Sequence, residues 1–281
     1  MLYNEDNQMV GISLPNIENS LKNQMVAMAK CLAKTQIKWS VNQKKLFTMM
    51  LTQINWSKSG NSNVIKLDKK EIIDALKLEI DETDRSSFLR KEFKKMMTNS
   101  MVSWTSPEDK DVWSDDLLIT GFSSKKYEVF VTINQKFMPL LENLVGQYHF
   151  VTMWSNDIYS FKSRFTFALF EELRINYDNR FFSNERDYTT KQLKELFGLS
   201  KNDYMNSSSG KFDRFNFEKY TLNVAIEEIN AGEMMTIIKV DKIKKNGRIV
   251  SYRIKYTVKT RTTPTQAQLD AMREDEDFEK E

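Results

Sequence analysis

Residues suited to catalysis or metal binding are scarce in this chain of 281 residues, which holds one cysteine, Cys31, and one histidine, His149. A metal-assisted nick in DNA needs a metal ion held by a His-x-His pair, and a single histidine cannot build that site. No stretch matches the phosphate-binding loop G-x-x-x-x-G-K followed by Ser or Thr, so there is no basis for an ATPase. We therefore expect no catalytic residue, no metal and no cofactor, and we expect Cys31 and His149 to be packing residues.

Side chains that recognise DNA are abundant in the stretch KFDRFNFEKYTLNVAIEEIN, residues 211–230. Asparagine pairs with adenine edges, arginine pairs with guanine, and both arginine and lysine bind phosphates. The predicted DNA-binding residues of this segment are Lys211, Arg214, Asn216, Lys219 and Asn223. The two asparagines and Lys219 share one arc of a helix, whereas Arg214 lies on the opposite flank with Thr221. Spacing alone does not decide which flank reads bases.

The same segment also carries apolar residues at helical spacing, which predict that it contributes to a core. The expected core face consists of Leu222, Ala225, Ile226 and Ile229, with Phe215 nearby. Asp213 is placed to cap the start of the helix, and Gly232 lies where the helix should end. Phe217, Tyr220 and Val224 fit neither face. Packing on a neighbouring element, contact with thymine methyl groups and contact with another protein all stay open for them.

Two further clusters of basic residues are predicted to contact DNA. Strands flanking Asn246-Gly247, a strong type I′ hairpin signal, carry Lys242, Lys244, Lys245 and Arg248 at their turn. One face of the second strand is apolar, with Tyr252, Ile254, Tyr256 and Val258. A helix expected over 85–99 turns Leu89, Phe93 and Met96 to one side and presents the candidates Arg85, Arg90, Lys91, Lys94 and Lys95. Solvated charged surfaces have the same pattern, so that alternative stays open.

The charge of the chain is distributed unevenly. Lys and Arg number 42 against 39 Asp and Glu, a net charge of +3, yet seven acidic and only two basic residues fall within 270–281. The rest of the chain is therefore more basic than the total suggests, as suits a polyanion binder. We expect the acidic segment after Pro264 to be disordered. No run of about 18 apolar residues is present, and residues 1–20 lack the pattern of a secretory signal, so we expect a cytoplasmic protein without membrane contact.

Helices and strands must position these basic clusters, and the first half of the chain predicts a definite order of such elements. Ser40 and Gln43 form a capping box that starts a helix, and the short strand NVIKL follows it. Asp68 and Glu71 start a second helix that runs to about Leu78, before the helix over 85–99. The stretches MVSWT, VWSDDLLITGF and KYEVFVTIN are predicted to form a small antiparallel sheet.

The second half repeats this order. One long helix is expected over 158–175, followed by the extended piece RDYT and a capping box of Thr189 and Gln192. Gly198 should end the helix that this box starts. The segment 211–230 and the hairpin complete the unit.

A helix, a short strand, two helices and a hairpin make up a winged helix, so we predict an α+β, predominantly helical fold of two tandem winged-helix domains. An ordinary α+β domain whose elements repeat by chance is the alternative. The predicted division is 1–20 as a flexible segment, 21–145 as the N-terminal domain for dimerisation and DNA backbone contacts, 146–260 as the sequence-specific C-terminal domain, and 261–281 as the acidic tail.

The stretch FDRFNFEKYTLNVAIEEINAGEMM resembles the second recognition helix of the iteron-binding replication initiators of theta-replicating bacterial plasmids. The shared pattern F-x-x-x-x-L-x-x-A-I-x-E-I-N is carried by Phe217, Leu222, Ala225, Ile226, Glu228, Ile229 and Asn230. YSFKSRFTFALFEEL resembles the helix that opens the second domain of that family, which implies DNA contacts by Lys162, Ser163 and Arg164. YTTKQLKELFGL and WSVNQKKLFTMMLTQI resemble two further helices of the family, so the resemblance runs from about Asn23 to Lys259.

The resemblance implies a bacterial cytoplasmic protein that binds direct repeats in double-stranded origin DNA and helps to melt the origin. It also implies recruitment of the host initiator and the replicative helicase. Homodimers in equilibrium with monomers are expected, with the dimer repressing its own gene. The family commonly has basic residues after the Phe matched by Phe217, whereas Glu218 stands here.

Two other functions compete with this one. A two-domain winged-helix transcriptional repressor without origin function would bind a single inverted repeat at a promoter. A protein-interaction module with merely solvated charged surfaces would show no sequence-selective DNA binding at low salt.

Overall fold

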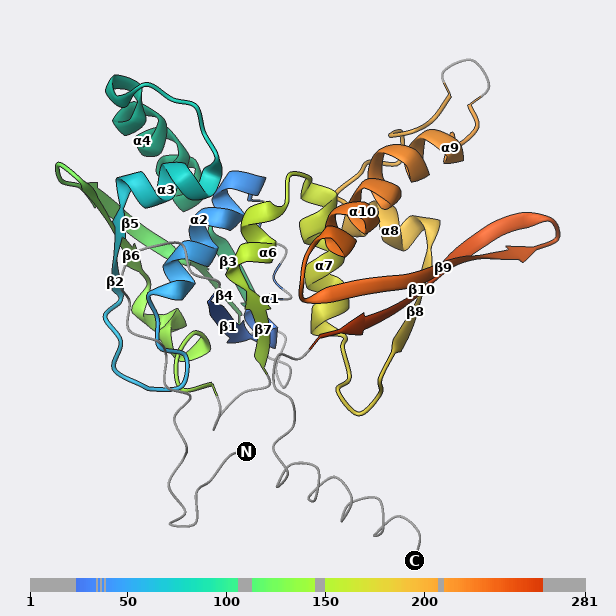
Figure 1. Ribbon diagram of the computed structural model, residues 1–281, viewed down its shortest axis with the longest axis horizontal. Helices are drawn as coiled ribbons and strands as arrows, with labels where there is room; N and C mark the ends of the chain where they lie inside the picture. The colour runs from blue at the N-terminus through green and yellow to red at the C-terminus, as the bar shows by residue number, and fades with distance from the viewer. Residues whose placement is uncertain are drawn as a thin grey trace, which may run out of the picture.

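The computed structural model describes residues 24–33, 35, 37, 39–105, 113–144, 150–206 and 210–259. Within these residues, two units built of helices and strands lie side by side (Figure 1). The first unit contains α2 (Val41–Thr52), β2 (Val64–Asp68), α3 (Lys69–Leu76), α4 (Glu82–Thr98), β3 (Met101–Thr105), β4 (Trp113–Leu117), β5 (Ile119–Ser124), β6 (Glu128–Ile133) and the 3₁₀ helix η1 (Gln135–Leu140). The second contains α6 (Ser155–Ser160), α7 (Arg164–Ile175), β8 (Asn184–Thr189), α8 (Thr190–Leu196), α9 (Arg214–Phe217), the π-helical turn η2 (Glu218–Leu222), α10 (Asn223–Ala231), β9 (Met235–Lys245) and β10 (Arg248–Val258).

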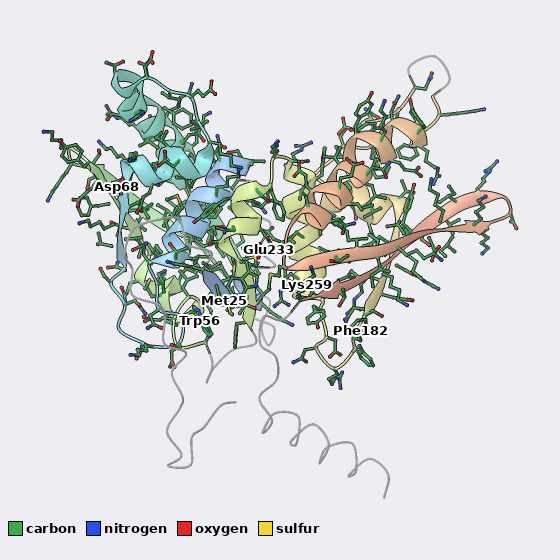
Figure 2. The ribbon with its side chains drawn as sticks, in the orientation of Figure 1. Met25, Trp56, Asp68, Phe182, Glu233 and Lys259 are labelled. Carbon is green, nitrogen blue, oxygen red and sulfur yellow. The ribbon has the colours of Figure 1, made fainter. Side chains whose placement is uncertain are left out.

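Local capping chemistry starts the helices where the sequence predicted. The Ser40 side chain accepts a hydrogen bond from the Gln43 backbone and the Gln43 side chain returns one, so the capping box before α2 is confirmed. Thr189 and Gln192 form the same box before α8. Asp68, at the start of α3, accepts from two backbone N–H groups (Figure 2). Each cap satisfies donors that the first helical turn leaves without partners.

The two units share one sheet topology, as the repeated element order predicted. The strand order is β2-β6-β5 in the first unit and β8-β10-β9 in the second, and every pairing is antiparallel. β2, before α3, pairs with β6, the last strand of the first unit, and β8, before α8, pairs with β10, the last strand of the second. The last two strands of each unit, β5 with β6 and β9 with β10, thus form its wing.

The prediction of one sheet for the strands after α4 was wrong. β3 and β4 pair only with each other in a separate two-stranded sheet, whereas β5 joins the sheet of β2 and β6. The change of partner occurs at Leu118, which is fully buried and whose N–H donates to the Ser100 carbonyl at 2.8 Å. Alternation of residues along VWSDDLLITGF did not reveal this break.

The single long helix predicted over 158–175 is two helices, α6 and α7. Phe161 has extended backbone angles, and the Ser163 side chain caps α7 by accepting from the Phe165 N–H at 3.1 Å. Burial explains why the sequence concealed the break, because Phe161 is as buried as the helical residues around it. The apolar pattern therefore continues through the interruption.

A small sheet and an ion pair join the two units. β1 (Met25–Ala29), which leads into α1 (Lys30–Ala33), pairs antiparallel with β7 (Phe150–Trp154) just before α6. Lys44 of α2 forms an ion pair with Glu171 of α7. One continuous cluster of buried apolar residues extends across both units. Gly146 lies outside the described residues, so the predicted domain division stays a prediction.

Cys31, expected to pack in the interior, is exposed, so that prediction was wrong. It lies in α1, a helix of four residues, of which only Leu32 is buried. His149, the segment 1–20 and the acidic tail 261–281 fall outside the described residues. Among the helices that the structure describes, none is long and apolar enough to cross a membrane.

Candidate nucleic-acid interface

The segment 211–230 forms an irregular helix in three parts. Asp213 caps it, as predicted, by accepting from the Asn216 N–H at 3.0 Å. α9 then passes through the π-helical turn η2 into α10, which ends at Ala231 before Gly232. A π turn inserts an extra residue, so side chains five apart come to share a face. Phe217 and Leu222 are related in this way, and both are buried.

The π turn corrects two predictions about the apolar residues of this helix. Phe217, which fitted no face in the sequence, is fully buried in an aromatic cluster, and Phe215, which was expected near the core, is 71% exposed. Thr221, predicted on an outer flank, is buried and donates to the Phe217 carbonyl. The rings around Phe217 belong to Phe197, Tyr204 and Phe212. Leu222, Ala225 and Ile229 are buried as expected, and Ile226 is half-buried.

The exposed side of this helix combines amide, cationic and aromatic side chains. Lys219 and Asn223 are both exposed, four residues apart. The Lys219 ammonium lies 5.0 Å from the ring centroid of Tyr220 and 5.9 Å from that of Phe215, within range of cation–π attraction. These contacts orient the lysine without neutralising its charge. The surface offers donors, a positive charge and two apolar rings to a groove.

Arg214 and Asn216 are engaged within the fold. The Arg214 guanidinium donates to the Tyr252 hydroxyl at 3.3 Å and to the Ile249 carbonyl at 3.2 Å, both in the wing. The Asn216 side chain donates to the Asp213 carboxylate at 2.6 Å and so reinforces the helix cap. Their donors therefore already have protein partners, and their role on DNA stays a prediction.

Glu218 connects the recognition helix to the wing. Its carboxylate accepts from the Tyr252 hydroxyl at 2.8 Å and forms an ion pair with Lys242 at 2.6 Å. Burial, and then the hydrogen bond to Glu218, raise the pKa of Tyr252 to about 12, so the hydroxyl stays protonated as a donor. The acidic residue at this position thus fixes the angle between helix and wing. It also occupies Lys242, one of the four cations predicted at the wing.

The AIEEIN block joins the recognition helix to its neighbours. The Glu228 carboxylate accepts from the Lys162 N–H at 3.0 Å and the Ser163 N–H at 3.1 Å, which holds the turn between α6 and α7. Asn230 pairs with the backbone of Ile237 in β9 through both its amide nitrogen and its amide oxygen. These residues carry the family resemblance, and they support the fold without being directed at a ligand.

Gly232 ends α10 for a reason that the sequence did not suggest. Its backbone is extended, with φ of −79°, so the left-handed conformation of many terminal glycines is absent. A Cβ atom at this position would lie 3.1 Å from the carboxyl carbon of Asp157. That carboxylate accepts from the N–H groups of Glu233 and Met234, at the junction between the two units (Figure 2). A side chain here would push its neighbours away by a few tenths of an ångström, so glycine suits this close approach.

The wing forms the predicted type I′ hairpin, since both Asn246 and Gly247 have positive φ angles, 51° and 74°. Its inner face is buried as predicted, through Tyr252, Ile254, Tyr256 and Val258. Lys244, Lys245 and Arg248 at the tip are exposed, and no ion pair reaches them from the part of the chain that the structure describes. Side chains project from this tip away from the fold (Figure 2).

Other cations of the wing are neutralised. Arg253 pairs with Asp187 at 2.8 Å, and Lys255 lies 3.5 Å from Glu185, both in β8. Positive charge is therefore concentrated at the tip of the hairpin, beyond the edge of β8.

Helix α4 presents a second basic surface. Leu89, Phe93 and Met96 are buried, as predicted, while Arg90, Lys91, Lys94 and Lys95 are exposed. Glu92 is buried and accepts from the Gln43 side chain at 3.3 Å, which anchors the helix to α2. Arg85 donates to the Ile80 carbonyl. α4 and α9 lie along the same edge of the molecule, one in each unit (Figure 1).

The turn between α6 and α7 lies between these surfaces. Lys162 and Arg164 are exposed, and the Arg164 guanidinium lies 5.0 Å from the centroid of the Phe165 ring. Ser163 is the N-cap of α7. The structure thus brings the predicted residues of this turn next to the recognition helix, through the hydrogen bonds to Glu228.

Two family models match this chain, and the first extends through α6 and into α7. The family model "Initiator Replication protein, WH1" matches residues 25–174, and "Initiator Rep protein, WH2" matches residues 189–256. The crystal structure of Pi initiator protein in complex with iteron DNA is 17% identical, with a TM-score of 0.62 over 85% of this chain and 98% of that chain. Domains 2 and 3 of RctB give 11% identity and a TM-score of 0.47 over 79% and 83% of the two chains. No curated protein matches the sequence significantly.

Proposed function

We propose, from the premise that this chain belongs to the initiator replication protein family with its WH1 and WH2 domains, that it initiates plasmid replication by binding direct repeats at the origin. The observation that carries the proposal is the pair of winged helices of equal topology. Their basic helices, α4 and the segment from α9 to α10, lie along one edge of the molecule (Figure 1). A duplex lying along that edge meets both units at once. The similarly folded Pi initiator protein was solved with iteron DNA, which supports the same ligand here.

Three groups of residues have distinct tasks in this proposal. Lys219 and Asn223 read bases in the major groove, because they are exposed on the recognition helix and keep their polar groups outward. Lys244, Lys245 and Arg248 at the wing tip bind the backbone, where charge rather than base identity decides affinity. The α4 cations bind the backbone of the same duplex from the first unit. Binding, not catalysis, is the proposed activity.

Origin melting, recruitment of the host initiator and helicase, and autorepression by a dimer complete the proposed role. A monomer places both winged helices on one repeat, whereas a dimer formed through the first unit represses the gene of the protein. Support for these steps comes from family membership. Sedimentation with and without repeat DNA tests the exchange between dimer and monomer, and loading of purified helicase onto repeat-containing plasmids tests recruitment.

The decisive experiment selects bound duplexes from random DNA and then footprints the protein on natural plasmid DNA that carries the selected sequence. Tandem copies in one orientation beside an AT-rich region are the expected result. A single inverted repeat at a promoter would instead favour a transcriptional repressor without origin function. Failure to select any sequence at low salt would leave only the protein-interaction alternative.

A further inference from the structure

Two aromatic rings are exposed on the recognition helix. Phe215 in α9 is 71% exposed and Tyr220 in η2 is 53% exposed, whereas Phe217 between them is fully buried. Phe215 and Tyr220 are five residues apart across the π turn, so they share a face, as Phe217 and Leu222 do on the buried side. The helix therefore has an apolar face in the core and a second, smaller apolar surface directed at solvent.

One ammonium group lies against both rings. The Lys219 Nζ atom is 5.9 Å from the ring centroid of Phe215 and 5.0 Å from that of Tyr220. Both distances are within the range of cation–π attraction, which holds the lysine and the rings together as one exposed cluster (Phe215, Lys219 and Tyr220). Lys219 is itself exposed, so a ligand that contacts this lysine also meets the rings.

Neighbouring side chains of the helix are directed elsewhere. Arg214 and Glu218 both contact the Tyr252 hydroxyl in the wing, and Phe217 packs among the rings of the core. The exposed cluster thus occupies the solvent side of the helix. α9 lies on the edge of the molecule proposed to face DNA, and a recognition helix places its outer side in the major groove (Figure 1).

This composition suits the major-groove edge of thymine. Thymine presents an apolar group there, the C5 methyl, which proteins recognise by apolar contact. A phenyl ring has no donor or acceptor for a phosphate or a polar base edge, so charge attraction does not account for Phe215. One methyl group transferred from water to an apolar contact raises affinity roughly fourfold.

We propose that Phe215 and Tyr220 recognise thymine through its C5 methyl group, next to the base contacted by Lys219. This inference rests on the proposed function and deepens it, because it names a base that the recognition helix selects. Both ring centroids lie within 5.9 Å of the Lys219 ammonium, so the thymines fall within about two base-pair steps of the base that this lysine contacts. Because Lys219 holds the rings in place before DNA binds, less side-chain freedom is lost on binding.

The test replaces each thymine of a selected duplex, one at a time, by deoxyuridine, which pairs in the same way and lacks only the methyl group. With wild type, one or two neighbouring positions should lose roughly fourfold in affinity, and the other positions should not change. Phe215→Ala should bind the unmodified duplex more weakly and show no further loss at one of these positions. Tyr220→Ala should behave in the same way, whereas Tyr220→Phe keeps the ring and should keep the sensitivity.

Two further variants serve as controls. Phe215→Leu keeps an apolar side chain at the exposed position and should retain part of the sensitivity to the methyl group. Phe182→Ala removes a phenyl ring that is 88% exposed between α7 and β8, away from the recognition helix, and should leave the scan unchanged.

The outcomes separate this inference from the proposed function. Equal deoxyuridine scans for wild type, Phe215→Ala and Tyr220→Ala, or a wild-type scan with no sensitive thymine, would overturn the inference and leave the proposed function standing. Methyl sensitivity on a site that is a single inverted repeat would support the inference and overturn the proposed function. Failure to select any sequence would overturn both.

Discussion

Asn230 and Ile237 are joined by a two-way hydrogen bond between a side chain and a backbone. The Asn230 amide nitrogen donates to the Ile237 carbonyl at 3.2 Å, and the amide oxygen accepts from the Ile237 N–H at 2.6 Å. Seven residues separate the partners, so the contact fixes the end of α10 to the start of the wing. Asn230, the asparagine of the family pattern, thus holds the helix and the hairpin together.

Asn230→Ala should therefore destabilise the protein, whereas Asn223→Ala should not. The first change removes both hydrogen bonds to Ile237 and should lower the free energy of unfolding by about 1 to 3 kcal/mol. The second removes an exposed amide of the same helix and should alter base preference at a cost of about 1 to 3 kcal/mol per lost contact. Urea unfolding and binding to selected and mutated duplexes separate the two effects. Equal loss of stability in both variants would show that Asn230 has no special structural role.

Replacing Lys244, Lys245 and Arg248 by Ala should weaken binding to all DNA sequences alike. Each lost phosphate contact lowers the slope of log affinity against log salt by about 0.9. The control is Arg253→Ala with Lys255→Ala, since both cations are paired to β8. Titrations at several salt concentrations with specific and random duplexes provide the measurement. A triple variant with an unchanged slope would place the wing tip away from the backbone.

Glu218→Ala should raise non-specific affinity and lower specificity. The change frees Lys242 for the backbone but removes the acceptor that holds Tyr252, so the angle between helix and wing loosens. Glu227→Ala is the matched control, because it removes an exposed carboxylate of the same helix. That control should raise specific and random binding equally. The hydrogen bond between Tyr252 and Glu218 can also be followed by a titration monitored by tyrosine absorbance. The pKa of Tyr252 should fall from about 12 once Glu218 is lost.

Lys45 should make stability depend on pH in alkaline solution. Its pKa is about 8 in the folded protein against an ordinary 10.5, so the unfolded chain holds the proton more tightly. The resulting destabilisation is fully present below pH 8 and disappears as the pH rises to 10.5, on the order of 2 to 3 kcal/mol in all. Lys45→Met should be more stable than wild type at pH 7, with the difference shrinking towards pH 10.5. A difference constant across that range would contradict the lowered pKa.

Much of the local structure was predictable from the sequence. Helix caps and tight turns depend on atoms only a few residues apart, so short sequence patterns predict them. Examples are the capping boxes at Ser40 and Thr189, the Asp213 cap and the Asn246-Gly247 turn. The repeated element order likewise predicted two winged helices, and both family models confirm them. The assignment of individual residues to DNA remains a prediction.

Several features of the site were not predictable, because each depends on partners distant in the sequence. A regular period of 3.6 residues placed Phe215 near the core and left Phe217 unassigned. With the π turn, Phe215 is exposed and Phe217 is buried. The break between α6 and α7 is held by Glu228, which lies 65 residues from Ser163. The sequence showed Glu218 only as a departure from the family pattern. Its contacts with Tyr252 and Lys242 form because the wing folds against the helix.

The sequence by itself determined the elements, their order and the positions of the basic clusters, because hydrophobic period and capping act locally. Only the tertiary structure decided which cations are paired with carboxylates. Pairing depends on which carboxylate comes within a few ångströms, as it does for Arg253 and Lys242. Among the residues that the structure describes, no carboxylate pairs with Lys244 or Lys245. The same holds for Lys45, because its burial results from the packing of α2 against α3 and α6, and no ion pair reaches it from the described residues.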